Sequence, residues 1–407
     1  MSNVLDERVE YAVKQLWLDP LNGNGDEAKR KLEEAVAEGN GDACFFLARC
    51  YFGECFVSPR FGFEENDDKG EDLLNRSIEA GSAIGMLGAK RLGGFKPRSG
   101  SFVHSPYNSW SEIWETVNGY ADKGQAFCQY LVGNALYYGD CIEILGIPED
   151  NVDLPMLQKF QNQAITYLEG CVEQGLYLAV GNLIDIYTSG DYGMPVNEKR
   201  AKELEKIGAD LGMGFYENKL GKELVGTDPE QAKKYFERAI SHGETSGYVQ
   251  LAKMYMYDGQ YPMDLRKAVS ILMEGYEKNP DNFGLTNNLG HIYFQGGDDF
   301  EPDYEKAVMY FEQAVKESDW CSDMLGTCYL NGLGTPVNYE KARELFMKYT
   351  GEELSRLGLG KIYCYGLGVK QDIKKGMEYL DKIPENKEAQ EVKSHFKKSL
   401  FGWKQIE

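Results

Sequence analysis

The stretch from Tyr329 to Phe346, YLNGLGTPVNYEKARELF, places two glycines just before the start of a charged helix. Glycines in such a position can expose backbone N–H groups that bind a phosphate, or they can form a plain turn between two helices. The segment from Tyr363 to Leu380, YCYGLGVKQDIKKGMEYL, repeats the same plan, and weaker versions lie upstream. A phosphate loop occurs once per nucleotide site, so recurrence at intervals of about 35 residues indicates a repeat array and favours the turn.

The first helix of each repeat is marked by an apolar anchor, a small residue directly after it and often a tyrosine four residues later. These positions share one face of an α-helix, so they predict a packing stripe with room for a close neighbour. The residue after the anchor is glycine or alanine in every repeat except one, where it is Ile184. The nine anchors are Leu47, Leu87, Val132, Leu183, Leu220, Leu251, Leu289, Leu325 and Leu359.

The second helix is marked by a small residue, a bulky residue four positions later and often another small residue seven positions later. Small residues at these spacings let two helices approach closely, so the sequence predicts stacked antiparallel helix pairs. The clearest triplets are Ala28/Leu32/Ala35, Gly70/Leu74/Ser77, Ala164/Leu168/Cys171, Ala232/Phe236/Ala239 and Ala307/Phe311/Ala314. In six repeats a glycine that could end the helix in the left-handed conformation follows. These glycines are Gly39, Gly81, Gly124, Gly175, Gly212 and Gly243.

The last two repeats, LGTCYLNGLGTPVNYEKARELF and LGKIYCYGLGVKQDIKKGMEYL, share Leu-Gly-x-x-Tyr, a Gly-x-Gly turn and a lysine early in the second helix. On these motifs the chain resembles the Sel-1-like repeat family, which is related to the tetratricopeptide repeats. The resemblance covers residues 26–383. It implies an all-α fold, a right-handed superhelical solenoid of antiparallel helix pairs with about twenty helices. The usual role of such a solenoid is protein–protein interaction.

The organisation of the chain follows from the spacing of these markers. We expect a single α-solenoid over residues 1–407, with an N-terminal helix and turn in 1–25 and a capping helix in 384–407. Length varies only between the first and second helices of a repeat. Long loops there are usually functional or disordered, so this edge could bind a partner or simply shield the array. The long loops are expected at 52–69, 93–111 and 139–160, and the third holds the acids Asp140, Glu143, Asp150 and Asp153.

The charge and the cysteines restrict the partners and the compartment. The chain has 44 Lys plus Arg and 65 Asp plus Glu, a formal net charge of −21. This charge repels nucleic acid and anionic lipid and favours a basic protein or peptide. The sequence has no apolar run of 18 residues and a charged N-terminus, so we expect no membrane span and no secretory signal. Nine cysteines without paired spacing predict buried thiols in a reducing, cytoplasmic compartment.

Motifs for catalysis or metal binding are not recognisable. The four histidines are scattered, and the chain has no His-Glu-x-x-His, Cys-x-x-Cys or Gly-x-Ser-x-Gly segment. We therefore expect neither an enzyme nor a metal or cofactor site. An enzyme with unrecognised chemistry stays open as an alternative.

The concave face of the solenoid is the candidate binding groove. Positions −5, −2, +2 and +5 from each anchor lie opposite the packing stripe, at about 100° per residue. Aromatic residues beside Asn and Asp suit a peptide-binding groove, whereas tight curvature would bury several of them against the next helix. The predicted partner-binding residues are Phe127, Tyr130, Asn134, Tyr137, Asp185, Asn218, Lys222, Lys253, Met256, Asn287, His291, Phe294, Trp320 and Asp323.

These features together predict a protein-interaction scaffold or adaptor that binds through the groove, the long-loop edge or both. An alternative is an immunity-type inhibitor that neutralises a toxin, for example a basic nuclease. The acidic charge suits both functions, so it does not separate them.

Overall fold

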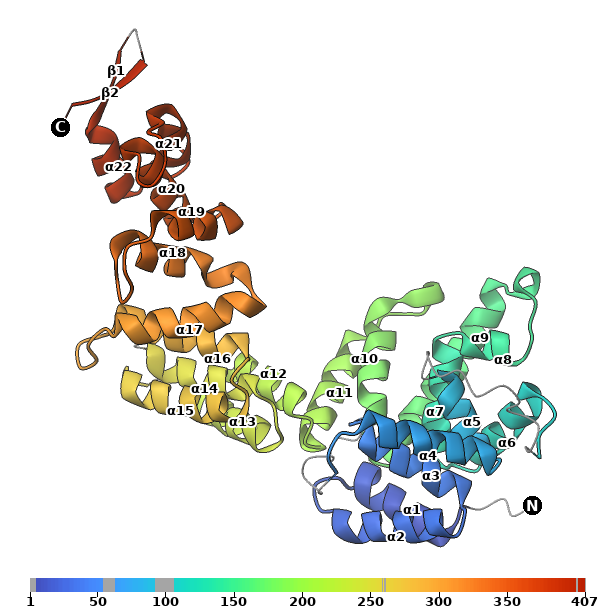
Figure 1. Cartoon of the computed structure of the whole chain (residues 1–407). Helices are drawn as coiled ribbons and strands as arrows, with labels where there is room; N and C mark the ends of the chain where they lie inside the picture. The colour runs from blue at the N-terminus through green and yellow to red at the C-terminus, as the bar shows by residue number, and fades with distance from the viewer. Residues whose placement is uncertain are drawn as a thin grey trace. The chain divides into compact units, whose positions relative to one another are not determined.

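The computed structural model describes residues 5–53, 63–91, 106–257, 259, 261–399 and 402–406. This part contains 22 α-helices, which confirms the predicted all-α class (Figure 1). Most first helices pack against the second helix that follows, as α16 does on α17 and α20 on α21. The structure is therefore an α-solenoid of helix pairs.

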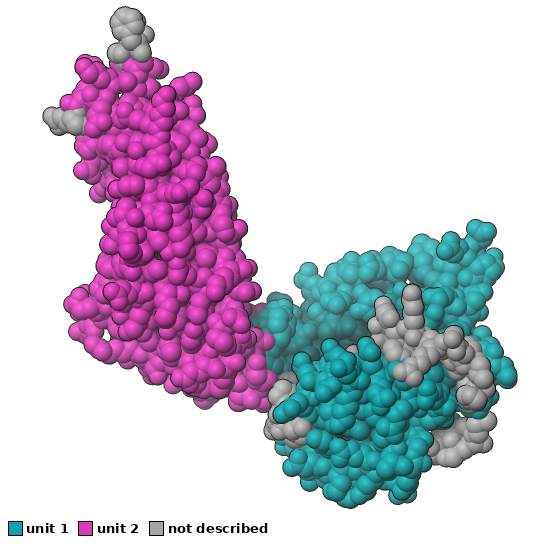
Figure 2. All heavy atoms as spheres, in the orientation of Figure 1, with its two compact units in different colours: residues 1–220 teal, residues 221–407 magenta. Residues whose placement is uncertain are grey.

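The chain divides into two compact units, residues 1–220 and 221–407, which Figure 2 shows in teal and magenta. The single solenoid over the whole chain stays a prediction. Unit 1 contains α1 (Glu7–Val13), a π-helical turn (Lys14–Leu18), α2 (Gly25–Ala37), α3 (Gly41–Tyr51), α4 (Asp67–Glu79), α5 (Ala83–Arg91), α6 (Trp110–Asp122), α7 (Ala126–Tyr137), α8 (Asp140–Ile144), α9 (Leu154–Glu173), α10 (Leu178–Ser189), α11 (Glu198–Asp210) and the start of α12 (Gly214–Leu224).

Unit 2 begins within α12 and ends in a two-stranded antiparallel hairpin. It contains α13 (Pro229–Ser241), α14 (Ser246–Met256), α15 (Leu265–Lys278), α16 (Phe283–Gln295), α17 (Tyr304–Glu317), α18 (Ser322–Asn331), α19 (Tyr339–Lys348), α20 (Glu353–Tyr365), α21 (Ile373–Leu380), α22 (Lys387–Ser394), β1 (Phe396–Ser399) and β2 (Gly402–Gln405).

The two sequence stripes form the core of both units. All nine anchors are buried, none of them more than 8% exposed. The small residue after the anchor leaves room for the bulky residue of the paired second helix. A Cβ added to Gly290 would lie 2.6 Å from the ring of Phe311, and one added to Gly221 would lie 2.5 Å from the ring of Phe236. The close approach of the two helices therefore depends on these glycines.

The glycine pair that opened the sequence analysis forms a turn between helices. Gly332 and Gly334 have φ angles of 71° and 66° and connect α18 to α19. A Cβ at Gly334 would also lie 2.2 Å from the backbone of Tyr304, which leaves room only for glycine. The six glycines predicted to end second helices have positive φ as well. The turn interpretation is confirmed.

Six repeats share one link between the end of the first helix and the start of the second. The backbone N–H of the Asn or Asp that caps the second helix donates to the tyrosine carbonyl oxygen at 2.8–2.9 Å. In five of these repeats a lysine three residues after the cap lies over the tyrosine ring, as Lys375 does at 3.9 Å from the centre of the Tyr363 ring. This link holds the start of the second helix at the end of the first, whatever the length of the segment between them. The tyrosine–cap pairs are Tyr51–Asn66, Tyr187–Asn197, Tyr255–Asp264, Tyr293–Asp303, Tyr329–Asn338 and Tyr363–Asp372.

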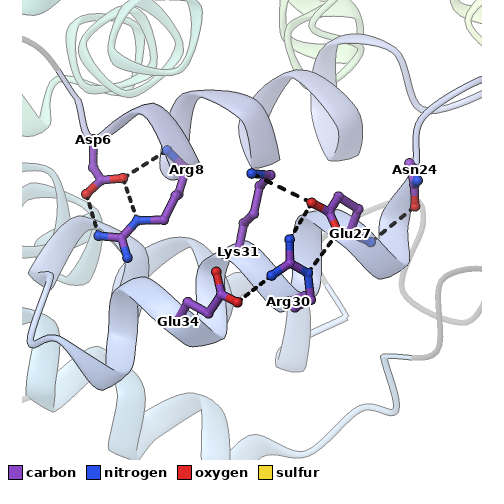
Figure 3. Close-up of polar contacts among 7 residues, drawn as sticks. All are labelled: Asp6, Arg8, Asn24, Glu27, Arg30, Lys31 and Glu34. Atoms are coloured by element: carbon purple, nitrogen blue, oxygen red, sulfur yellow. Dashed lines mark hydrogen bonds and ion pairs between the residues drawn. The ribbon is translucent and has the colours of Figure 1, made fainter.

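The N-terminal helices carry polar contacts on their surface (Figure 3). Arg8 pairs with Asp6 at 2.8 Å, and Arg30 pairs with Glu27 at 2.6 Å. Asn24 caps α2 by accepting a hydrogen bond from the Glu27 N–H at 3.1 Å. Ion pairs near the surface contribute little stability each, but they give the terminal repeat the polar outer face that a solenoid end needs.

The expectation of a loop over 139–160 is wrong. The segment folds into α8, a short 3-10 turn at Glu149–Asn151 and the first turns of α9. Helix α8 is held because Cys141 and Ile144 are buried and Asp140 pairs with Arg91 of α5 at 2.7 Å. The other two predicted loops lie partly outside the described residues, and α4 and α6 begin near their ends.

The capping helix predicted for the C-terminus is shorter than expected. Helix α22 ends at Ser394, and the chain continues into β1 and β2. Phe396, the first residue of β1, is buried and lies 5.3 Å from the Tyr365 ring, measured between ring centres. Gly402 takes a φ of 115°, which favours glycine at this end of the hairpin. Phe396 thus packs on the last repeat from a strand and not from the expected helix.

Candidate functional site

The structure buries five of the fourteen predicted groove residues, which corrects that part of the prediction. They are Phe127, Asn134, Asn218, Met256 and Asp323. Asp185, Lys222, Lys253 and Trp320 are exposed, and the remaining five, Tyr130, Tyr137, Asn287, His291 and Phe294, are half-buried. Eight of the fourteen are expected to be more exposed than the anchors: Tyr130, Asn134, Tyr137, Asp185, Lys253, Asn287, His291 and Trp320. Among these eight only Asn134, at 2% exposed, is as buried as the anchors.

Unit 1 fills its predicted groove with its own aromatic side chains. The ring of Phe127 on α7 lies 4.8 Å from Phe46 on α3 and 5.7 Å from Trp17, measured between ring centres. The turn at Gly175 also reaches the N-terminal segment, because a Cβ there would lie 2.6 Å from the carbonyl oxygen of Leu18. Segments far apart in the sequence meet here, so tight curvature explains the burial in this unit.

In unit 2 the predicted groove residues cover their own repeat. The His291 ring packs edge-on against Phe311 at 5.4 Å, and burial lowers the pKa of His291. Phe294 lies 5.5 Å from Tyr304 and 6.3 Å from Phe311. Both side chains therefore complete the contact between α16 and α17 and leave only part of their surface for a partner.

The most exposed large apolar side chain in the described part of the chain is Trp320, at 69%. Its ring stacks on Tyr349 with 6.5 Å between ring centres and 26° between ring planes. The ion pair between Lys348 and Asp319, at 2.9 Å, joins the same two segments beside the rings. Trp320 lies in a 3-10 turn between α17 and α18, and Tyr349 follows α19. We call these four residues the Trp320 platform; it lies where second helices turn into first helices, outside the groove.

A second exposed aromatic pair lies at the edge of unit 1. Tyr138 is 57% exposed, and its ring lies 4.8 Å from that of Tyr137. Arg91 lies over Tyr138 at 5.6 Å and pairs with Asp140, while Glu143 pairs with Lys90. Two acids of the predicted acidic edge are therefore occupied in holding α8 to α5, and reversing their charge would test folding as well as binding.

A cavity of about 810 Å³ lies between two turns of unit 2. It is lined by residues of 262–267 and 297–300. Arg266 donates to the carbonyl oxygen of Asp299 at 3.0 Å, and Lys267 lies over the Tyr255 ring at 4.1 Å. The carboxylates Asp264, Asp298 and Asp299 share this lining with apolar and aromatic side chains. The sequence analysis missed it, although the run Gly-Gly-Asp-Asp at 296–299 marks the turn.

Within the described residues no group of three or more His, Cys, Asp or Glu is placed to hold a metal ion. The eight cysteines that the structure describes are buried and form no disulfide with one another, and Cys55 lies outside the described residues. Burial raises the pKa of several of these thiols, that of Cys328 to about 12. None of the described helices is both long and apolar enough to cross a membrane.

Comparison with known protein families identifies the repeats. The model of the Sel1 repeat matches seven segments, which together cover more than half of the chain: 41–82, 126–152, 177–213, 209–244, 286–319, 323–348 and 354–383. The chain belongs to the Sel1 repeat family. Proteins with Sel1 repeats generally mediate protein–protein interaction and are typically not enzymes.

Similar solved structures have little sequence in common with this Sel1 repeat protein. A protective antigen of uropathogenic Escherichia coli with an SLR fold is 18% identical, with a TM-score of 0.52 over 95% of this chain and 86% of that one. A Sel1 repeat protein from Oxalobacter formigenes is 17% identical, with a TM-score of 0.45 over 55% and 91%. An immunity protein from Pseudomonas aeruginosa is 12% identical, with a TM-score of 0.31 over 58% and 81%. No curated protein matches the chain. These likenesses concern the fold alone.

Proposed function

We propose that this Sel1 repeat protein is a scaffold that binds a partner protein through the Trp320 platform. The observation that supports the proposal is a tryptophan that is 69% exposed yet held in place by a stacked tyrosine. Trp and Tyr are the residues most enriched among those that dominate binding energy. A ring that is already ordered loses little conformational entropy when a partner covers it.

The partner that suits this chain is a basic protein in a reducing, cytoplasmic compartment. The net charge of −21 would attract such a partner and speed its association. Exposed acids such as Glu149 and Asp150 add to this field near the Tyr138 edge. Eight buried cysteines without a disulfide among them fit a compartment that keeps thiols reduced.

The test places a photo-crosslinking amino acid at position 320 in the native host and at Met309 as the control. Met309 is 44% exposed and lies on α17 of the same unit. We expect one protein to crosslink from position 320 and none from position 309. With the purified partner, Trp320→Ala should weaken binding by about 2 kcal/mol or more, roughly thirtyfold in Kd. Equal affinity of Trp320→Ala and Met309→Ala would reject the platform.

An immunity-type inhibitor is the second candidate, and the observation that favours it is the same acidic charge, which would complement a basic toxin. Coexpression with a toxin encoded beside this gene tests it. If the protein protects the cell from the toxin and Trp320→Ala abolishes this protection, the scaffold acts as an immunity-type inhibitor through the Trp320 platform. If survival of the cell does not depend on this protein, the inhibitor hypothesis is rejected and the scaffold proposal stands.

A further inference from the structure

A small polar cavity of about 210 Å³ lies in unit 1, where α2 turns into α3 and α4 turns into α5. Its lining includes Asp42, Ser82, Tyr107 and Tyr120. Asp42 belongs to the first turn of α3, and Tyr120 comes from α6. The cavity is thus built from four segments of the solenoid, near its N-terminal end in the sequence (Figure 1).

Asp42 is the one carboxylate among the described residues that line this cavity. Ser82 donates a hydrogen bond to Oδ1 of Asp42 and accepts one from the Gly85 N–H at 2.9 Å. Burial raises the pKa of Asp42, the Ser82 hydrogen bond lowers it less, and the charge of Asp6 raises it further. No lysine, arginine or histidine of the described residues forms an ion pair with Asp42. A carboxylate removed from water without a cation is costly, so this cavity favours a positive ligand.

The two tyrosines suit the same ligand. Burial raises the pKa of Tyr107 and of Tyr120, so both rings stay neutral near pH 7. Neutral aromatic rings attract cations, and together with a carboxylate they form the usual surroundings of a bound ammonium group. Among the described residues of the lining there is no arginine or lysine that would compete for Asp42.

We propose that this cavity binds the side-chain ammonium group of a lysine on the partner protein. Lysine fits better than arginine because Ser82 already occupies Oδ1 of Asp42. A guanidinium binds best to both carboxylate oxygens at once, whereas an ammonium is a compact charge that needs only one. The net charge of −21 supports a basic partner as the source of that lysine. The inference rests on the proposed role in partner binding but does not depend on the Trp320 platform.

The chain supplies a matched control for Asp42. The tripeptide Asn-Gly-Asp begins α3 at residues 40–42 and also begins α2 at residues 24–26. In both helices the asparagine caps the helix and the aspartate lies in the first turn. Asp26 is exposed and does not line the cavity. Asp26→Asn therefore repeats the chemical change of Asp42→Asn at the same helix position without touching the site.

The experiment measures saturation-transfer NMR on the full chain with n-butylammonium chloride, and with n-butanol as the uncharged probe. We expect transfer to n-butylammonium that falls at least fivefold in Asp42→Asn and is unchanged in Asp26→Asn, with little transfer to n-butanol. Tyr120→Leu removes one wall and should weaken the signal as well, which keeps the test valid if Asp42→Asn does not fold. Equal transfer in the wild type and in Asp42→Asn, or equal transfer to both probes, would overturn the proposal.

Two further probes separate the sources of the cation. Nα-acetyl-lysine methylamide should show the same dependence on Asp42 as n-butylammonium; if only n-butylammonium does, the cavity takes small amines and the lysine proposal is wrong. Stronger transfer to n-propylguanidinium would show a preference for arginine and also overturn it. Trp320→Ala should leave every one of these signals unchanged. If the probes bind but position 320 gives no crosslink, the Trp320 platform is rejected as the partner site and the cavity proposal stands.

Discussion

Replacing Gly290 with alanine should destabilise the pair α16–α17, although alanine is the better helix former. The added Cβ would lie 2.6 Å from Cδ1 and Cε1 of Phe311, far closer than van der Waals contact. The Phe311 ring is fully buried and is held between His291 and Phe294, so it has no free space to enter. Overpacking of this kind costs about 1–3 kcal/mol. The gain in helix propensity, about 0.5–1 kcal/mol, offsets only part of this cost.

The assay must resolve one repeat, because a long repeat array does not unfold as a single two-state unit. Hydrogen exchange of peptides that cover 283–317 would report the local opening free energy. We expect Gly290→Ala to lower it by about 0.5–2 kcal/mol, the difference of the two terms above. Gly119→Ala in α6 is the control, since a Cβ there meets no atom within 4 Å and should stabilise its helix.

A double-mutant cycle with Phe311→Leu tests the cause. A smaller side chain at position 311 should cost stability alone but relieve the overlap in the Gly290→Ala background. The two changes are in direct contact, so a coupling free energy of about 1 kcal/mol or more is expected. If Gly290→Ala is as stable as the wild type, or if the two changes are additive, close packing at the glycine is not the reason for its place in the repeat.

Two other predictions follow from the repeat links and the thiols. Lys375→Met removes the ammonium group 3.9 Å from the Tyr363 ring and should lower the local stability of α20–α21 by about 0.5–1 kcal/mol, measured by hydrogen exchange; unchanged exchange would refute it. A thiol reagent should react with all nine cysteines after denaturation without reductant, and only slowly with the eight buried ones in the folded protein. Recovery of seven thiols or fewer would contradict the reducing compartment.

The sequence was sufficient for the fold because the same local interactions recur in each repeat. Anchors, small residues and helix-ending glycines act over a few residues, so their spacing predicts both the helix pairs and the turn at Gly332. The burial of Phe127 could not be predicted this way. It depends on how strongly successive repeats curve, which brings Trp17 and Phe127 together across many residues. Helical periodicity shows on which face of its helix a residue lies. It does not show which other segment the curvature of the solenoid packs against that face.

The candidate sites were harder to predict for a related reason. Trp320 was found as an aromatic at a groove position, but the structure places it in the turn that precedes α18, where Tyr349 of the next repeat completes the platform. The cavity at Asp42 had no signal of its own in the sequence, because the tripeptide that carries it also occurs at residues 24–26. Only the neighbouring repeat, which supplies Ser82, and Tyr120 from α6 distinguish the two aspartates.

Because the two identical tripeptides have different surroundings, removing the charge of Asp42 and removing that of Asp26 should have opposite effects on stability. The site disfavours the charged form of the Asp42 carboxyl, which is why burial raises its pKa. A carboxyl whose pKa is raised on folding stabilises the protein below its unfolded pKa of about 3.9, and this contribution is lost as the pH rises through the folded pKa. Of the described residues, those around it are Ser82, Tyr107, Tyr120 and the charge of Asp6, none of which is a cation.

Asp42→Asn should therefore raise the urea midpoint of unfolding at pH 7 relative to Asp26→Asn, and the difference should shrink at pH 3. Both variants lose the favourable interaction of a carboxylate with the N-terminus of a helix, about 0.3–1 kcal/mol, so this effect cancels in the comparison. The Ser82 hydroxyl can still donate to the asparagine side-chain oxygen, so no buried donor is left unpaired. A lower midpoint for Asp42→Asn at pH 7 would mean that the carboxylate is already neutralised within the chain. A higher one would mean that the protein keeps a destabilising charge, as expected of a residue retained to bind a cation from outside.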